Sequence, residues 1–236
     1  MRISSGSKDL DGWLEGGFES DIITTFYGPA GSGKTNLCLL AAANAARKGK
    51  KVIFVDTEGG FSVDRLNQIA DENLMKKIIL LKPTNFIEQR NALDKIAKLV
   101  SKDIGLIIVD SLVMLYRLEL GEALTSDDRK RAQIINRILA KQLRILSGIS
   151  RKKNIPVLVT NQVYGEFLTK EEFAQGKEKG VVMVGGSIVK YWSKCIIELK
   201  NLEEGKKKAI LKKHRSLPEK EFYFQVDNKG IKKTKF

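Results

Sequence analysis

Short apolar runs alternate along the chain with longer stretches in which apolar residues recur every three or four positions. The short runs predict strands at Ile22–Tyr27, Lys51–Asp56, Ile78–Leu81, Leu106–Asp110 and Val157–Thr160. The stretches with helical spacing predict helices at Lys34–Lys48, Asp64–Asn73, Phe86–Ser101 and Asp127–Lys153. This alternation predicts an α/β fold, with a mostly parallel central sheet flanked by helices.

The pattern changes after the last of these strands. Tyr164–Gly186 carries glycines and charges with weak periodicity, which predicts a functional or disordered loop. Three later apolar runs predict short strands, at Lys194–Leu199, Lys207–Lys212 and Glu221–Val226. We expect them to form an antiparallel C-terminal extension of the sheet. Because no linker or internal repeat divides the chain, residues 1–236 are expected to form a single domain.

A glycine-rich sequence follows the first strand and opens the first helix. It fits the phosphate-binding pattern G-x-x-x-x-G-K-[ST] with Gly28, Pro29, Ala30, Gly31, Ser32, Gly33, Lys34 and Thr35. The glycines allow backbone N–H groups to surround phosphate oxygens. Lys34 is expected to reach the β- and γ-phosphates, and the Thr35 hydroxyl to ligate Mg²⁺. The alternative, a purely structural glycine turn, fits the strand and helix on either side less well.

Polar side chains also end three other predicted strands. Asp110 is placed to hold Mg²⁺ through water, and Glu58 to orient or deprotonate an attacking water. Asp56 is expected to act locally at its strand end. Asn161 and Gln162 can hydrogen-bond a γ-phosphate and lose that bond on hydrolysis. The alternatives left open are turn-capping roles for Asp110 and for the Asn161–Gln162 pair, and a solvated turn for Glu58.

Charge and apolar content limit the classes of partner. The chain has 42 Lys or Arg and 28 Asp or Glu, a net charge of +14. Half of that excess lies from Lys200 onward, where 12 basic residues face 5 acidic ones. Such a surface attracts nucleic acid, although lysine enrichment also accompanies thermostability. No apolar run is long enough for a membrane span, and no signal peptide is evident, so a cytoplasmic location is expected. Cys38 and Cys195 are expected in the core.

The polar strand ends, taken together, resemble those of the RecA/RadA recombinase family. The matching sequences are "SSGSKDLDGWLEGGF", "GPAGSGKT", "VDTEGGF", "LIIVDS", "VTNQV", the pair Gly185-Gly186 and "LPEKEFYFQVDNKGI". The resemblance implies a RecA-like P-loop ATPase core that binds ATP and Mg²⁺, with Glu58 activating water and Gln162 reporting the γ-phosphate. It also implies DNA-contacting loops after Ser111 and Val163. The candidate DNA contacts are Arg117, Tyr164, Phe167, Lys170, Lys177 and Lys179.

The chain departs from that family at three places. The family's helix-hairpin-helix domain and self-assembly plug are expected to be absent, which leaves filament formation open. Ser62 stands where the family often has an adenine-stacking arginine. In "KHRSLP", basic residues replace the family's acidic cap, so Lys212 or Lys213, with Arg215, is expected to contact ATP across a subunit interface. The alternative is a solvated basic strand, and His214 is expected to be an exposed strand residue.

Two functions fit these features. The first is an accessory recombinase paralogue in recombination and repair, a weak DNA-dependent ATPase that binds single- or double-stranded DNA. The second is an ATP-gated regulator with negligible catalysis, which binds the main recombinase or another repair protein. A KaiC-like or helicase-like role fits the "VTNQV" and "LPEKEFYF" sequences less well. The sequence leaves homo-oligomerisation open.

Overall fold

A nine-stranded sheet forms the centre of the molecule, in a computed structural model that describes residues 1–70, 72–165 and 181–235. The strand order is β13-β12-β11-β10-β3-β7-β6-β4-β5. Their bounds are β3 Ile23–Tyr27, β4 Lys51–Asp56, β5 Ile78–Leu81, β6 Ile104–Asp110, β7 Val157–Asn161, β10 Ser193–Asn201, β11 Lys206–Lys213, β12 Glu221–Asp227 and β13 Gly230–Lys233. The strands from β10 to β5 are parallel, and β11, β12 and β13 continue the sheet antiparallel. The predicted α/β architecture and an antiparallel C-terminal extension are therefore confirmed, but the first of the three strands expected in that extension, β10, is parallel to β3.

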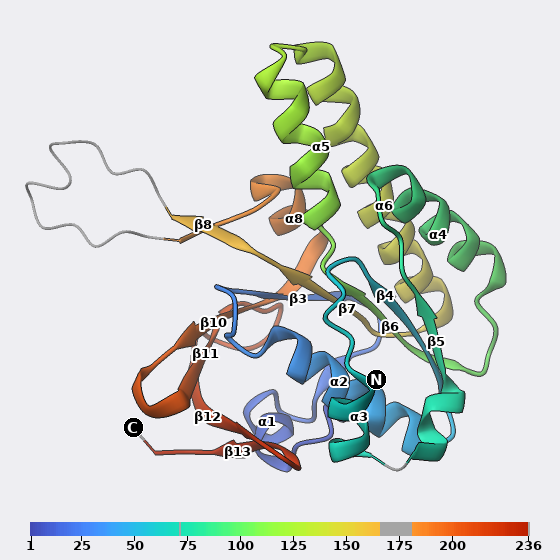
Figure 1. The fold of residues 1–236 in the computed structure, drawn as a ribbon. Coiled ribbons are helices and arrows are strands. Elements are labelled where there is room, and N and C mark those ends of the chain that lie inside the picture. The colour runs from blue at the N-terminus through green and yellow to red at the C-terminus, as the bar shows by residue number, and fades with distance from the viewer. Residues whose placement is uncertain (71, 166–180, 236) are drawn as a thin grey trace, which may run out of the picture.

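Helices cover both faces of this sheet (Figure 1). One apolar core joins the sheet to α1 Lys8–Trp13, α2 Lys34–Arg47 and α3 Val63–Ile69. A second core joins the opposite face to α4 Phe86–Leu99, α5 Met114–Thr125, α6 Arg129–Lys153 and α8 Gly186–Trp192. The remaining elements are short, namely β1 Arg2–Ile3, β2 Phe18–Glu19, β8 Val163–Gly165, β9 Val181–Met183 and the 3-10 helices Glu72–Lys77 and Glu203–Gly205. Cys38 and Cys195 are buried, as expected.

The strand register determines where the polar strand ends lie. In the register, Asp56 of β4 lies opposite Asp110 of β6, and Tyr27 of β3 lies opposite Asn161 of β7. Adjacent parallel strands thus bring their carboxyl ends to one edge of the sheet, where ligands bind in open α/β folds. Each of these strands is fully buried up to its last residue, except for Lys51 at the start of β4 and Gly105 in β6.

Two segments predicted as loops contain regular structure. The segment after Ser111 forms α5, and part of Tyr164–Gly186 forms the β8–β9 hairpin. Helix signals for α5 are weak, because Val113 at its N-terminus provides no side-chain cap and Gly121 lies inside it. The predicted helix at Asp64–Asn73 is α3 followed by a separate 3-10 helix. Within the described residues, no helix has the length and apolar character needed to cross a membrane.

Candidate nucleotide site

The glycine-rich loop connects the buried strand β3 to α2, as the sequence predicts. Gly28 allows an unusually close approach of the neighbouring strand β10, because a Cβ atom at this position would lie 2.2 Å from the Leu199 carbonyl oxygen. Gly31 and Gly33 have φ angles of 72° and 98°, in the left-handed region that favours glycine. Glycine is therefore required both for the turn and for the packing of the loop against the sheet.

Lys34 points back along this loop. Its Nζ atom donates hydrogen bonds of 2.8 Å to the carbonyl oxygens of Gly28 and Pro29, and the residue is 8% exposed. Burial lowers the pKa of Lys34, while the nearby carboxylates of Glu58 and Asp110 act in the opposite direction. The ammonium group thus lies at the mouth of the loop, where two neutral carbonyl oxygens hold it.

Asp110 connects three elements at the carboxyl edge of the sheet. Its Oδ2 atom accepts a 2.7 Å hydrogen bond from the Thr35 hydroxyl, and its Oδ1 atom accepts a short one from Thr160. The residue is 2% exposed, and burial raises the pKa of its carboxyl group despite both hydrogen bonds. The predicted metal-binding pair, Thr35 and Asp110, is therefore brought into direct contact. The peptide bond between Asp110 and Ser111 is cis.

Asp56 has a different role from its neighbour Asp110. Its two carboxylate oxygens accept hydrogen bonds of 3.1 Å from the backbone N–H groups of Gly60 and Phe61. These bonds close the turn that carries Glu58. The expected local role of Asp56 is confirmed, and its structural partners leave Glu58 as the carboxylate of this strand end that faces the site.

Glu58 and Gln162 meet across two strand ends. The Gln162 Nε2 atom donates a 2.9 Å hydrogen bond to Glu58 Oε1, although the residues are 104 positions apart. Asn161 instead turns inward, where its Nδ2 atom donates to the Val184 carbonyl oxygen at 2.8 Å. The structure thus separates the two amides: Gln162 lies in the site, and Asn161 connects β7 to the segment before α8.

The loop has features that fit a phosphate group. The Ser32 hydroxyl is buried and has no hydrogen-bond partner within the described residues. A buried hydroxyl without a partner is unfavourable and can be satisfied by a ligand oxygen. The described residues contain no cluster of three or more His, Cys, Asp or Glu side chains that could hold a metal by itself. A magnesium ion would therefore depend on Thr35, Asp110, water and phosphate oxygens together.

Two contacts to the loop come from β10 and β11, and no sequence motif indicates them. Asn201 Nδ2 donates to the Ala30 carbonyl oxygen at 3.1 Å, and Lys207 Nζ donates to the Gly31 carbonyl oxygen at 2.5 Å. Lys207 also donates to Asn201 Oδ1 at 3.1 Å, and partial burial lowers the pKa of its ammonium group. Both residues thus fix carbonyl oxygens of the loop from the side of β10 and β11.

The structure describes two of the six residues that are candidate DNA contacts. Arg117 lies exposed on α5, a helix where a loop had been expected, and Tyr164 lies in β8 with 42% of its surface exposed. The remaining candidates, Phe167, Lys170, Lys177 and Lys179, lie outside the described residues. DNA contact by these six residues stays a prediction.

The basic residues near "KHRSLP" have partners within the chain. Lys212 pairs with Glu219 at 2.6 Å, and Lys213 donates to the Lys190 carbonyl oxygen at 2.6 Å. Arg215 forms a two-bond pair with Asp21, at 2.7 and 2.9 Å. An ATP contact across an interface stays a prediction and would require these side chains to leave or share their partners.

His214 is not an exposed strand residue, so that expectation was wrong. Its side chain is 3% exposed, and burial lowers its pKa. The chain turns after β11, and the ring Nδ1 atom accepts the backbone N–H groups of Ser216 and Leu217, each at 3.2 Å. The residue therefore stabilises a turn.

Ser62, which stands in place of the family's arginine, caps α3. Its hydroxyl accepts a 3.0 Å hydrogen bond from the Arg65 backbone N–H. The Arg65 guanidinium donates to Asn36 Oδ1 and to the Asp227 carbonyl oxygen, each at 2.7 Å. This part of the chain thus connects α3, α2 and the β12–β13 turn, and a weaker contact to the base stays a prediction.

We expect Asp110→Asn to stabilise the ligand-free protein by roughly 1 kcal/mol, because it removes a buried charge and keeps partners for both threonine hydroxyls. The same variant should lose the thermal stabilisation that Mg²⁺ and ATP give. Asp56→Asn is the matched control. It should cost about 1–3 kcal/mol, since one buried backbone N–H loses its acceptor. Thermal and urea unfolding measure both changes, and a destabilised Asp110→Asn protein would contradict the prediction.

We expect Lys207→Met to weaken ATP and ADP binding on the order of tenfold, because a charge-assisted bond to the loop is lost. Asn201→Ala should have a smaller effect. The control is Lys208→Met, since Lys208 pairs with Glu221 at 2.5 Å instead of the loop. Calorimetric titration with each nucleotide provides the test, and equal dissociation constants for the Lys207 and Lys208 variants would refute the role of Lys207.

Comparisons with known proteins agree with this geometry. The sequence model of the Rad51 family matches residues 1–234. The "DNA repair and recombination protein RadB" of Methanobrevibacter smithii is 42% identical, over 95% of this chain and 93% of its own length. The protein of the same name from Methanococcoides burtonii is 41% identical, over 92% and 91%. A crystal structure of the RadB recombinase superposes with a TM-score of 0.78 at 34% identity, over 99% of this chain and 100% of that one. The chain belongs to the Rad51 family.

Proposed function

We propose that this chain is an ATP-binding and DNA-binding accessory recombinase paralogue that acts in recombination and repair with weak ATP hydrolysis. The name carried by its relatives supports the biological role. The hydrogen bond between Gln162 and Glu58 supports the chemistry, because it joins the two side chains that the hydrolytic step requires. We also propose that residues 1–236 act as one ATPase unit in the cytoplasm.

The loop amides and Lys34 would bind the phosphates. On binding, the Lys34 ammonium exchanges the carbonyl oxygens of Gly28 and Pro29 for phosphate oxygens. The Ser32 hydroxyl gains the partner that it lacks. Thr35 and Asp110 would hold Mg²⁺, which supplies positive charge against the phosphate oxygens when it is bound. These exchanges favour the bound state because Lys34 replaces neutral acceptors with anionic ones and the Ser32 hydroxyl gains a partner.

Glu58 would act as the base or orienting group for water. Its carboxylate lies at the edge of the sheet, and the Gln162 amide occupies one of its oxygens. If the Gln162 amide turns to a γ-phosphate oxygen, Glu58 is released to accept a proton from water. Loss of the phosphate would restore the bond between the two residues. Since Gln162 directly precedes β8, this exchange can change the hairpin that leads to the candidate DNA contacts.

We expect Glu58→Gln to bind ATP as wild type does but to lose most hydrolysis, roughly a hundredfold or more, because the base is removed. Lys34→Ala should lose ATP binding instead, by at least about tenfold. Single-turnover hydrolysis and nucleotide titration, each with and without DNA, separate the two effects. If Glu58→Gln turns over ATP at the wild-type rate, another group prepares the water and this assignment fails.

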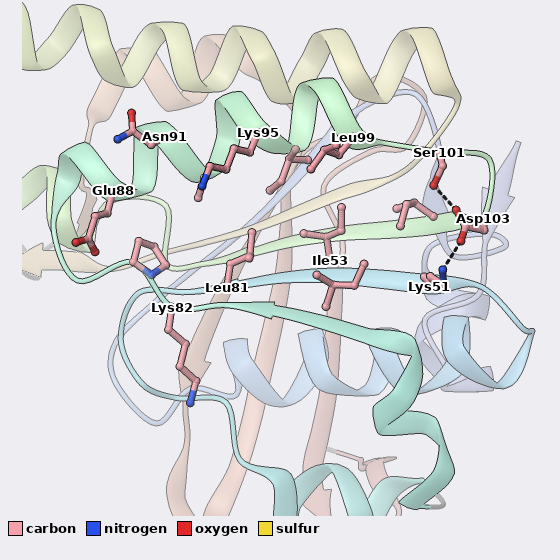
Figure 2. Close-up of a pocket in the computed structure, with 15 residues that line it drawn as sticks. Lys51, Ile53, Leu81, Lys82, Glu88, Asn91, Lys95, Leu99, Ser101 and Asp103 are labelled. Atoms are coloured by element: carbon pink, nitrogen blue, oxygen red, sulfur yellow. Dashed lines mark hydrogen bonds and ion pairs between the residues drawn. The ribbon is translucent and has the colours of Figure 1, made fainter.

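The regulator function is favoured by a groove at the edge of the sheet. It lies between the outermost strand β5 and α4, with a cavity volume of about 480 Å³. Figure 2 shows Leu81 and Ile53 on its strand side, with Lys95 and Leu99 on its helix side. Ile79 and Leu99 are 42% and 74% exposed, which is unfavourable for apolar side chains in water.

We propose that an extended segment of a partner repair protein occupies this groove. One edge of β5 has no partner strand in the described sheet, so its backbone can pair with an added strand. Lys82 and Lys95 lie at the rim and are exposed, a charge that suits a segment with acidic residues beside an apolar anchor. The main recombinase of the same cell is the partner that this second function requires.

We expect Leu99→Glu to weaken binding of the purified main recombinase on the order of tenfold, because it places a charge in the apolar groove. Leu118→Glu is the matched control, since Leu118 is 55% exposed on α5, away from the groove. Biolayer interferometry with both variants gives the comparison. Equal binding by the two variants would remove the groove from the proposal, and light scattering would report whether it serves self-association instead.

A further inference from the structure

The helix α6 has an unusual charge composition. Its 25 residues include nine Lys or Arg and no Asp or Glu. Basic residues in its last turn, Arg151, Lys152 and Lys153, favour the helix because they oppose its dipole. The basic residues of the first turn have the opposite effect, and Arg137 and Lys141 repel each other at i, i+4 spacing. Helix stability therefore does not explain the composition of α6.

Four of the basic residues form a regular row, which we call the α6 stripe: Lys130, Arg137, Arg144 and Arg151. They are seven positions apart, so each lies about 20° around the helix from the previous one. All four are exposed, whereas the apolar residues of α6, such as Leu139 and Leu146, are buried against the sheet. The row is roughly 32 Å long, at about 1.5 Å per residue.

The stripe has no acidic partners in the described part of the chain. The ion pairs of α6 involve other residues, with Arg131 held by Glu119 and Glu122, and Lys141 lying 3.8 Å from Asp94. An amphipathic basic helix can bind a membrane surface by inserting its apolar face, but that face is occupied here by the sheet. The stripe thus offers positive charge without an ion-pair partner in the described residues, on a helix that is packed against the sheet.

Further basic groups lie on both sides of the stripe. Arg144, Lys152 and Lys153 line a hollow of about 350 Å³ toward the end of α4. Arg151 lines another of about 360 Å³ on the opposite side, shared with Lys194 and with Asp21, whose carboxylate is paired with Arg215. Figure 1 shows α6 between α4 and α8, on the face of the sheet opposite α2. The positive surface is therefore broad as well as long.

We propose that the α6 stripe is a binding surface for the phosphate backbone of duplex DNA, separate from the loops that the family resemblance implies. Its length is close to one turn of B-DNA, about 34 Å, so all four residues can follow one duplex. Arginine suits this contact because its planar group donates two hydrogen bonds to one phosphate. The inference rests on the proposed DNA-binding function and assigns it a location and a preferred substrate.

The test compares two variants that each lower the net charge from +14 to +11. The first, Arg137→Gln/Arg144→Gln/Arg151→Gln, removes the stripe. The control, Lys8→Gln/Lys48→Gln/Lys76→Gln, removes exposed charges from α1, the end of α2 and the 3-10 helix on the opposite face. Fluorescence anisotropy with a labelled duplex of roughly 20 base pairs, two helical turns, measures affinity over a range of KCl concentrations.

We expect the stripe variant to bind the duplex at least about tenfold more weakly than the control. For this variant, the slope of log affinity against log salt concentration should become less negative by roughly 2 to 3, since each neutralised phosphate contributes about 0.9 to that slope. ATP binding and melting temperature should match the control. The affinity for a single strand of the same length should fall less, and the slope of its log affinity against log salt concentration should change less.

Three results would overturn the inference. Equal duplex affinity of the two variants would remove the stripe while leaving the proposed DNA binding intact. An equal loss for single strands would show that the stripe does not select the duplex. A third contrary result would be that poly-glutamate displaces the labelled duplex as effectively as unlabelled duplex does, at equal concentrations of negative charge. The stripe would then be a binding surface for acidic protein. Failure of the wild-type protein to bind any DNA would instead refute the proposed function itself.

Discussion

The alignment of parallel strands is the constraint on which the candidate site depends. Backbone hydrogen bonds place Asp56 beside Asp110, and the same register carries β3 and β7 to the same edge. Glu58 and Gln162 are 104 positions apart in the sequence, and the alignment of their strands brings the two side chains into contact. The apolar strand interiors supply the free energy that holds this edge, because they bury nearly every residue before the polar ends.

The site is less stable in isolation than the core beneath it. Burial disfavours the charged form of Asp110 and raises its pKa. Among the residues that the structure describes, the Ser32 hydroxyl lacks a hydrogen-bond partner, and the Lys34 ammonium donates hydrogen bonds only to its own loop. Asp56, one strand away, is equally buried and fully satisfied by the turn that it closes. Unsatisfied groups thus gather where a nucleotide would satisfy them, and satisfied ones maintain the turn that supports the site.

Strands β10 and β11 are part of this site as well as of the sheet. The Leu199 carbonyl packs against Gly28, while Asn201 of β10 and Lys207 of β11 donate hydrogen bonds to the loop carbonyls of Ala30 and Gly31. The last parallel strand and the first antiparallel one therefore help to orient the first loop. This arrangement couples the C-terminal region, which carries half of the net charge from Lys200 onward, to the nucleotide.

The sequence by itself determined the strands, the phosphate loop and the polar strand ends, because apolar periodicity and a glycine motif are local properties. It could not reveal that Lys207 reaches Gly31, since that contact joins residues 176 positions apart and depends on strand register. Nor could it place His214 inside a turn, or show that the Ser111 hydroxyl accepts the Met114 N–H at the start of α5. Those outcomes depend on packing and on hydrogen bonds between distant elements, and only the tertiary structure decides them.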